Sequence, residues 1–133
     1  VFVADTGVDL LAVAVGSSHA MTTRDALLDE ALIRELRASV DVPLVLHGSS
    51  GVSDEGMARA IAAGMTKINV STHLNKVMTG SVRSTLSDDP RIVDPRKWMA
   101  PACQAVEDEA YRLLTLYARH RAGVTHSATP AEL

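Results

Sequence analysis

Residues 43–51 read PLVLHGSSG, a short apolar run that ends in a histidine and a glycine-flanked polar turn. Two similar apolar runs lie on either side of it, LLAVAV at residues 10–15 and TKINV at residues 66–70. The first two runs are continuous rather than alternating, which is typical of parallel strands covered on both faces. We therefore predict three parallel strands over residues 10–15, 43–47 and 66–70.

Helical patterns separate the three predicted strands. Leu28, Leu32 and Leu36 recur at a spacing of four residues, which places them on one face of a helix. Ser53 is a favourable N-cap for a second helix, and Gly64 is a natural residue to end it. Strand, helix, strand, helix, strand is a series of βαβ units, so the sequence predicts an α/β fold.

The chain is predicted to be helical after the third strand. Residues 72–86 form one helix, residues 89–95 a proline-containing loop, and Pro101 the first turn of a long helix that Gly123 ends. Residues 124–133 have no apolar periodicity and are predicted to be a disordered tail.

Three strands alone make a poor domain, because both edges of such a parallel sheet are open and invite aggregation. The opening residues 1–7, VFVADTG, resemble the end of a helix that has lost its start, and the first residue is Val1 rather than Met. Either further strands precede Val1 or a partner covers the edges, and the opening residues favour further strands.

Composition excludes several classes of protein. Of the 133 residues, 47% are hydrophobic and 22% are charged, which is the composition of a globular protein. A net charge of −3 argues against a general nucleic-acid binder. No apolar run approaches the length of about 20 residues that a membrane span needs. The single cysteine, Cys103, suits a reducing compartment and a cytoplasmic location.

Polar residues follow each predicted strand at its carboxyl end, where parallel α/β folds place their sites. These residues are His19 after the first strand, His47 and the turn at residues 48–51 after the second, and Asn69, Ser71 and Thr72 after the third. A random scatter of such residues would not align in this way three times, so we predict a functional site at this edge.

His19 and His47 are candidate metal ligands, because Zn²⁺ favours imidazole nitrogen. The alternative is that each is an ordinary hydrogen-bonded loop histidine. Two ligands are too few for a catalytic zinc ion, which usually has three protein ligands, so the metal interpretation requires a further ligand.

The turn at residues 48–51 leads toward a helix start and suits phosphate, since backbone N–H groups there bind anions. Thr72 also stands at a helix start, where capping explains it as well as phosphate binding does. Asn69 is placed either to reach a substrate hydroxyl or to tie a loop. Lys67 suits a Schiff base if it is buried, although an ion pair with a carboxylate at strand depth is the favoured explanation.

The segments TGVDLLAVAVGSSHA, VPLVLHGSSGV, KINVST and DPRKWMAPA, in this order and spacing, resemble class II ketose-bisphosphate aldolases. These are zinc-dependent TIM-barrel enzymes that act on fructose or tagatose bisphosphate. The resemblance implies that the three strands are the last three of eight. Residues 1–123 would then form the C-terminal part of a TIM (β/α)₈ barrel, namely three βα units with C-terminal helices.

The resemblance also assigns roles to individual residues. It implies that His19 and His47 are two of three zinc-binding histidines. The turn residues Gly48, Ser49 and Ser50 would bind the phosphate of dihydroxyacetone phosphate, and Asn69, Val70, Ser71 and Thr72 would contact the same ketose half. The third histidine and the acid/base aspartate belong to an earlier strand, so no catalytic residue is expected in this chain.

Three departures from the family pattern stand in this region. Ala20 replaces a common glycine, Ser49 changes the usual HGGSG to HGSSG, and Ser71 stands where many fructose-specific members carry aspartate. The small residue at position 71 favours the tagatose type.

The expected function is zinc-dependent, reversible cleavage of a ketose 1,6-bisphosphate to dihydroxyacetone phosphate and glyceraldehyde 3-phosphate, a lyase reaction of glycolysis and related carbohydrate metabolism. This chain would be an incomplete C-terminal portion of an enzyme that is a homo-oligomer at full length. One alternative is a non-catalytic, aldolase-like subunit or pseudoenzyme that binds a partner. Another is a Schiff-base aldolase that uses Lys67.

Overall fold

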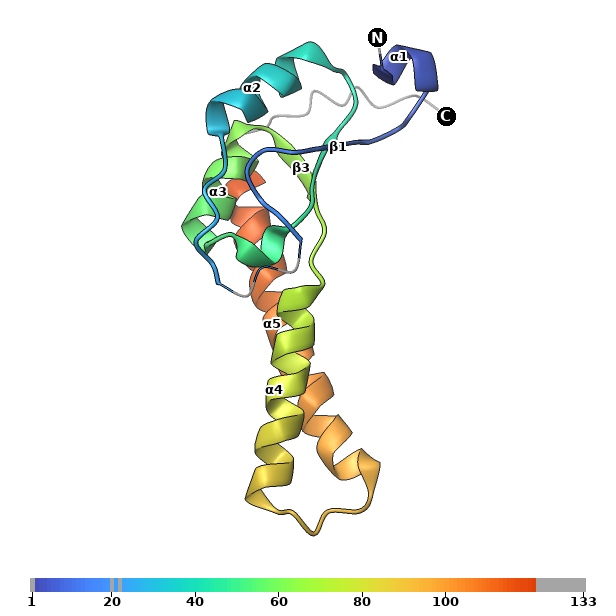
Figure 1. Cartoon of the computed structure of the whole chain (residues 1–133), viewed down its shortest axis with the longest axis vertical. Helices are drawn as coiled ribbons and strands as arrows, with labels where there is room; N and C mark the ends of the chain where they lie inside the picture. Colours follow the sequence, from blue (N-terminus) through green and yellow to red (C-terminus); the bar gives the residue numbers. More distant parts are fainter. Residues whose placement is uncertain (1, 20, 22, 122–133) are drawn as a thin grey trace, which may run out of the picture.

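The computed structural model describes residues 2–19, 21 and 23–121, and Figure 1 shows the order of the helices and strands along the chain. They are α1 (Phe2–Thr6), β1 (Leu11–Val13), α2 (Glu30–Ser39), β2 (Leu44–Leu46), the 3₁₀ helix η1 (Ser49–Gly51), α3 (Asp54–Ala63), β3 (Met65–Ile68), α4 (Thr72–Asp88) and α5 (Pro95–Arg121). This order confirms the predicted α/β fold, with strands shorter than the apolar runs. The predicted tail and the predicted helix end at Gly123 lie outside the described residues.

The three strands form one parallel sheet in the order β1-β2-β3. One face of the sheet carries Leu44, Leu46 and Met65, which are buried in the same apolar cluster as Ile33 of α2 and Met57 of α3. This cluster is the core of the described chain, and it contains Ala60, Ile61, Ala63, Val15 and Val52 as well.

The opposite face of the sheet is only partly covered. Val45 is buried there, whereas its neighbours in register, Ala12 of β1 and Lys67 of β3, are exposed. We predicted strands covered on both faces from their continuous apolar runs. Within the described residues, helices cover one face, and the other is exposed at Ala12 and Lys67.

The predicted ends of α3 agree with the backbone, whereas α2 starts at Glu30, after Leu28, which was predicted to lie on its apolar face. Asp29 caps α2, because its side chain accepts a hydrogen bond from the backbone N–H of Leu32 at 2.9 Å. Ser53 caps α3 in the same way through the backbone N–H of Gly56 at 3.1 Å. Gly64 ends α3 with a φ of 125°, which a residue with a side chain rarely adopts.

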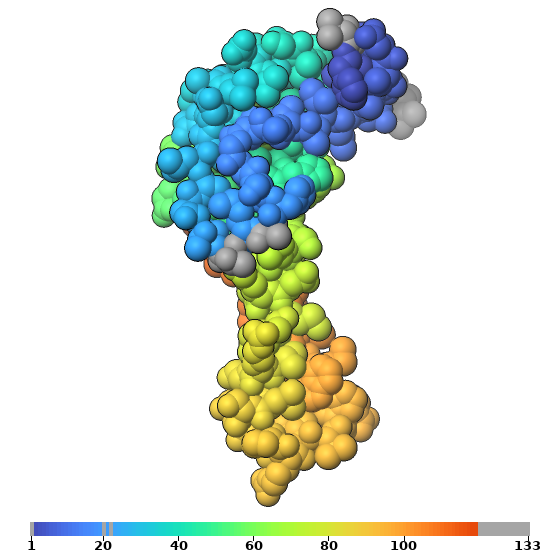
Figure 2. Space-filling model, in the orientation of Figure 1, coloured from blue at the N-terminus to red at the C-terminus, as the bar shows by residue number. Residues whose placement is uncertain are grey.

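Helices α4 and α5 form a hairpin that extends away from the sheet (Figure 1). The space-filling view shows the tip of this hairpin as a separate yellow and orange lobe below the α/β body (Figure 2). The other end of α5 returns to the body, where it packs against α3 and buries Leu113. No described helix is both long enough and apolar enough to cross a membrane.

The start of α5 differs from the prediction. The helix begins at Pro95 and contains Pro101 in its interior, so Pro101 is not its first turn. Asp94 caps this start, since its side chain accepts from the backbone N–H of Arg96 at 3.0 Å. Aspartate followed by proline is a favourable pair for an N-cap and first helical residue, so the helix starts there and continues through Pro101. Cys103 is exposed on α5.

Candidate active site

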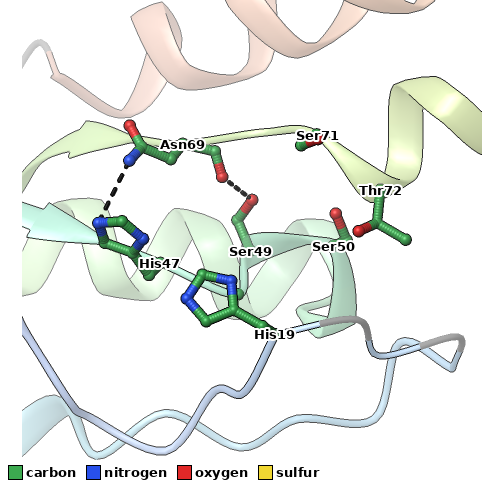
Figure 3. A pocket seen from close by; sticks show the side chains of 8 residues that line it. His19, His47, Ser49, Ser50, Asn69, Ser71 and Thr72 are labelled. Atoms are coloured by element: carbon green, nitrogen blue, oxygen red, sulfur yellow. Dashed lines mark hydrogen bonds between the residues drawn. The ribbon is translucent and has the colours of Figure 1, made fainter.

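A cavity of about 230 Å³ opens at the carboxyl edge of the sheet (Figure 3). Its walls come from the segments that follow all three strands. The lining residues are His19, His47, Gly48, Ser49, Ser50, Asn69, Ser71 and Thr72. The structure therefore brings together every residue predicted for the site except Val70.

The two histidines lie side by side at the cavity, one from each of two neighbouring strand ends. The ring centroids of His19 and His47 are 5.3 Å apart, and the ring planes meet at 66°. Two imidazoles that share one tetrahedral zinc ion through bonds of about 2.0–2.1 Å have ring centroids roughly 5 Å apart. The hydroxyl of Ser17 donates to the His47 carbonyl at 2.6 Å and ties the two strand ends together. The separation of the two rings matches the value for a shared zinc ion, and it is the only feature of the pair that bears on a shared ion.

Asn69 extends this arrangement from the third strand. Its backbone N–H donates to the Leu46 carbonyl at 3.1 Å, which continues the parallel pairing beyond β3. Its side-chain Nδ2 lies 3.3 Å from Nε2 of His47 (Figure 3). Asn69 is thus placed both to orient the imidazole and to face a ligand in the cavity.

The polar turn after β2 has a backbone that requires glycine at its first position. Gly48 has a φ of 68°, and a Cβ added there would lie 2.5 Å from the carbonyl oxygen of Ser18. Close approach of the turn to Ser18 also keeps it beside His19. A side chain at position 48 would separate the two segments that carry the candidate metal ligands.

Ser49, which departs from the family pattern, has a specific structural role. Its side chain is buried, and its hydroxyl donates to the Asn69 carbonyl at 2.6 Å. The hydroxyl therefore joins the turn to the end of β3, and Figure 3 shows this bond running from one strand end to the other. The extra side chain is therefore engaged with the end of β3.

The start of α4 meets the same turn. Its N-cap is Ser71, whose side chain makes no capping bond, so capping does not account for Thr72, the first helical residue. The backbone N–H of His73 donates to the hydroxyl of Ser50 at 3.0 Å. Ser50 and Thr72 lie next to each other at one end of the cavity (Figure 3).

Val70 and Lys67 are not at the cavity. Val70 lines a much smaller hollow behind the turn, together with Arg24, His73 and Tyr117. Extended chain alternates its side chains between two sides, so Asn69 and Ser71 face the cavity and Val70 faces away. Lys67 is exposed and is not among the cavity-lining residues, an arrangement unlike the buried lysine that a Schiff base was expected to use.

A chain of ion pairs behind the turn was not predicted. Nε2 of His73 lies 2.6 Å from a carboxylate oxygen of Glu109 in α5. Arg112 binds that carboxylate through two nitrogens, at 2.7 and 2.8 Å, and reaches Asp54 in the first turn of α3 at 2.5 Å. Asp54 also accepts a hydrogen bond from the Arg24 guanidinium at 2.5 Å.

The charged groups of these ion pairs stabilise one another. Hydrogen bonds from Arg112 lower the pKa of Glu109 to about 2, partial burial opposes this shift, and His73 adds to it. Burial alone would raise the pKa of Asp54, but hydrogen bonds from Arg112 and Arg24 outweigh it and lower that pKa. The spacing of Glu109 and Arg112, three residues apart on a helix, was the signal in the sequence for their ion pair. Nothing in the sequence indicated that this pair also contacts His73.

Among the described residues, no cluster of three or more His, Cys, Asp or Glu side chains could hold a metal ion. None of the residues that line the cavity carries a carboxylate. The arrangement therefore offers two imidazoles, a glycine turn, a helix start and an amide, and a complete metal site would need at least one more ligand.

Residues 1–120 match the sequence model of the fructose-bisphosphate aldolase class-II family. The chain is similar in structure to the YdjI aldolase from Escherichia coli K12, with 33% identity and a TM-score of 0.73 over 87% of this chain and 41% of that one. It also shares its fold with a candidate fructose-1,6-biphosphate aldolase from Coccidioides immitis, at 20% identity and a TM-score of 0.70 over 86% of this chain and 40% of that one. The chain thus spans about two fifths of the length of these aldolases.

Proposed function

This chain belongs to the class II fructose-bisphosphate aldolase family, and on that premise we propose that it forms the phosphate-binding part and two thirds of the metal site of a zinc-dependent aldolase. The proposed reaction is the reversible cleavage of fructose or tagatose 1,6-bisphosphate to dihydroxyacetone phosphate and glyceraldehyde 3-phosphate. One observation carries the proposal: two histidines, a glycine turn and a helix start from three successive strands line a single cavity.

His19 and His47 would hold the zinc ion, together with a histidine from an earlier strand of the barrel. Cleavage between C3 and C4 leaves negative charge on the three-carbon half of the sugar, and bound zinc supplies Lewis-acid stabilisation of that charge. The ring separation of 5.3 Å supports a shared ion. A zinc-binding His47 would donate its other ring N–H to the Asn69 side chain, which requires the amide oxygen rather than Nδ2 to face Nε2 and would then keep the ring in its orientation.

The turn and the start of α4 would hold the phosphate of the triose half. Gly48, Ser49 and Ser50 present backbone N–H groups, and Thr72 stands in the first turn of α4, where free N–H groups and the helix dipole favour an anion. Asn69 and Ser71 would contact the sugar beside it, whereas Val70 supports the segment from behind. Fixing the phosphate fixes the reacting carbons relative to metal and base.

The proton of the C4 hydroxyl must pass to a general base. No carboxylate lines the cavity within the described residues. We therefore assign this role to an aspartate on an earlier strand of the barrel, as the family resemblance implies. Ser71, a small residue, favours tagatose bisphosphate over its fructose epimer.

We further propose that the enzyme is cytoplasmic and homo-oligomeric and binds neither nucleic acid nor membrane. The net charge of −3 and the single cysteine support this assignment. The partly exposed sheet face at Ala12 and Lys67 supports residues 1–123 as one portion of a larger barrel.

The test is an assay of the full-length gene product for release of dihydroxyacetone phosphate from each bisphosphate. EDTA should abolish release and zinc should restore it, whereas borohydride with substrate should leave the enzyme active. His19→Ala and His47→Ala should each lose zinc and activity, while His126→Ala, beyond the family match, should retain both. Full zinc content in both cavity variants would refute the metal site.

A further inference from the structure

Glu109 lies on α5, and its carboxylate bonds His73 and Arg112, neither of which lines the cavity. We propose that it is a positioning residue: through His73 it fixes the start of α4 against Ser50, so that the Ser50 hydroxyl donates its proton to a phosphate oxygen. This inference rests on the proposed function, because it concerns how the phosphate is held.

The first step is the hydrogen-bonding capacity of Ser50. A serine hydroxyl has one proton to donate and two lone pairs that accept. The backbone N–H of His73 already occupies one lone pair at 3.0 Å. A hydroxyl that accepts from the protein side in this way keeps its proton for a partner on the other side, and Ser50 lines the cavity there.

The second step is what holds the His73 backbone in place. The N-cap of α4, Ser71, makes no side-chain capping bond, so no local cap secures this helix start. The side chain of His73 instead bonds Glu109 at 2.6 Å, and both side chains are mostly covered, with exposed fractions of 22% and 17%. The first turn of α4 is thereby anchored on α5.

The third step is the rigidity of the anchor itself. Arg112 donates hydrogen bonds from two nitrogens to the Glu109 carboxylate and one to Asp54 in the first turn of α3. The helices that start on either side of the phosphate turn, α3 and α4, are therefore tied to one short segment of α5. Two-point contact between guanidinium and carboxylate fixes orientation as well as distance.

A purely structural ion pair makes a different prediction from a positioning pair. Loss of a structural pair lowers the free energy of unfolding whether or not Ser50 has a hydroxyl. Loss of a positioning pair weakens phosphate binding because the Ser50 hydroxyl is no longer held in place. When that hydroxyl is already absent, the same loss should weaken phosphate binding little further. A double-mutant cycle between Glu109 and Ser50 separates the two.

The experiment uses the zinc-loaded, full-length gene product, with dihydroxyacetone phosphate and inorganic phosphate as probes. Glu109→Gln should raise the Kd of both probes about 3- to 10-fold and raise KM similarly, with kcat changed less than about twofold. In a Ser50→Ala background the same change should add less than about twofold. Glu107→Gln is the matched control, because Glu107 is exposed on the same helix.

The outcomes distinguish this inference from the function on which it rests. If the wild-type protein binds neither probe, the proposed function fails. If it binds both and Glu109→Gln leaves the Kd unchanged, or adds its full effect to Ser50→Ala, the positioning role is overturned. If Glu109→Gln does not fold, Glu109→Asp is measured in the same cycle, since it keeps the charge that Arg112 binds and shortens the reach to His73.

Discussion

The side-chain amide of Asn69 lies 3.3 Å from Nε2 of His47. A residue at the end of β3 thus orients a residue at the end of β2, and the two side chains face the same cavity. Under the proposed function, the residue that contacts the sugar also controls the geometry of the metal ligand. Substrate binding and metal binding should therefore respond together to changes at position 69.

Asn69→Ala should lower the zinc affinity of the full-length gene product about tenfold, because the His47 ring loses the partner that orients it. The measurement is competition for zinc against a chromophoric chelator. Asn75→Ala is the matched control, since Asn75 is exposed on α4. Equal zinc affinity in the wild type and Asn69→Ala would show that the amide does not orient the ligand.

Gly48→Ala should destabilise the protein and weaken both zinc and triose phosphate binding. The left-handed backbone at this position costs a residue with a side chain about 1–2 kcal/mol, and the contact with the Ser18 carbonyl adds to it. Displacement of Ser18 also moves His19. Urea unfolding and isothermal titration would measure the two effects.

Gly80→Ala provides the contrast. Gly80 lies inside α4 with open space where its Cβ would stand, so alanine there should stabilise the helix by about 0.5–1 kcal/mol. Loss of binding in Gly80→Ala equal to that in Gly48→Ala would contradict a specific role for the turn.

The grouping of the candidate site residues at one cavity was predictable from the sequence, because parallel strands bring their carboxyl ends to one edge. His19, His47, Ser50, Asn69 and Thr72 each follow a strand, so knowing the strands was enough to place them together. The orientation of the Val70 side chain away from the cavity was also predictable, because side chains alternate along an extended chain and Val70 therefore faces away from its two neighbours.

The ion pairs behind the turn were not predictable in the same way. His73 and Glu109 are 36 residues apart, and their contact depends on how far α4 and α5 extend before the chain reverses. The prediction started α5 at Pro101 instead of Pro95, which is an error of more than one helical turn. The Asp94-Pro95 pair was the signal that would have corrected it.

Acid should weaken the fold through Glu109. Its pKa of about 2 in the folded protein lies below its ordinary value of 4.5, so its ion pairs stabilise the protein fully above about pH 5. This contribution is lost as pH falls from about 4.5 toward 2, because the unfolded chain then takes up the proton first. We expect about 1–2 kcal/mol after allowance for solvent around Arg112.

Urea unfolding at pH 7, 5 and 3 would measure this contribution as the difference between the wild type and Glu109→Gln. That difference should shrink toward pH 3, whereas Glu107→Gln should differ little from the wild type at any pH. A difference that stays constant with pH would mean that the Glu109 charge does not stabilise the fold.

The 133-residue chain on its own should show no aldolase turnover, even with zinc added. Its described residues offer two imidazoles at the cavity, and a catalytic zinc usually has three protein ligands. With two ligands the ion lacks the fixed geometry that Lewis-acid catalysis needs, and no carboxylate lines the cavity to take the C4 hydroxyl proton.

The same chain should still bind dihydroxyacetone phosphate weakly, because the turn and the start of α4 are complete within it. Release of triose phosphate and binding of the probe would be measured side by side on the purified chain, with the full-length gene product as the positive control. Turnover by the chain alone would mean that the base and the third ligand lie within these 133 residues, and that both have been assigned to the wrong strand.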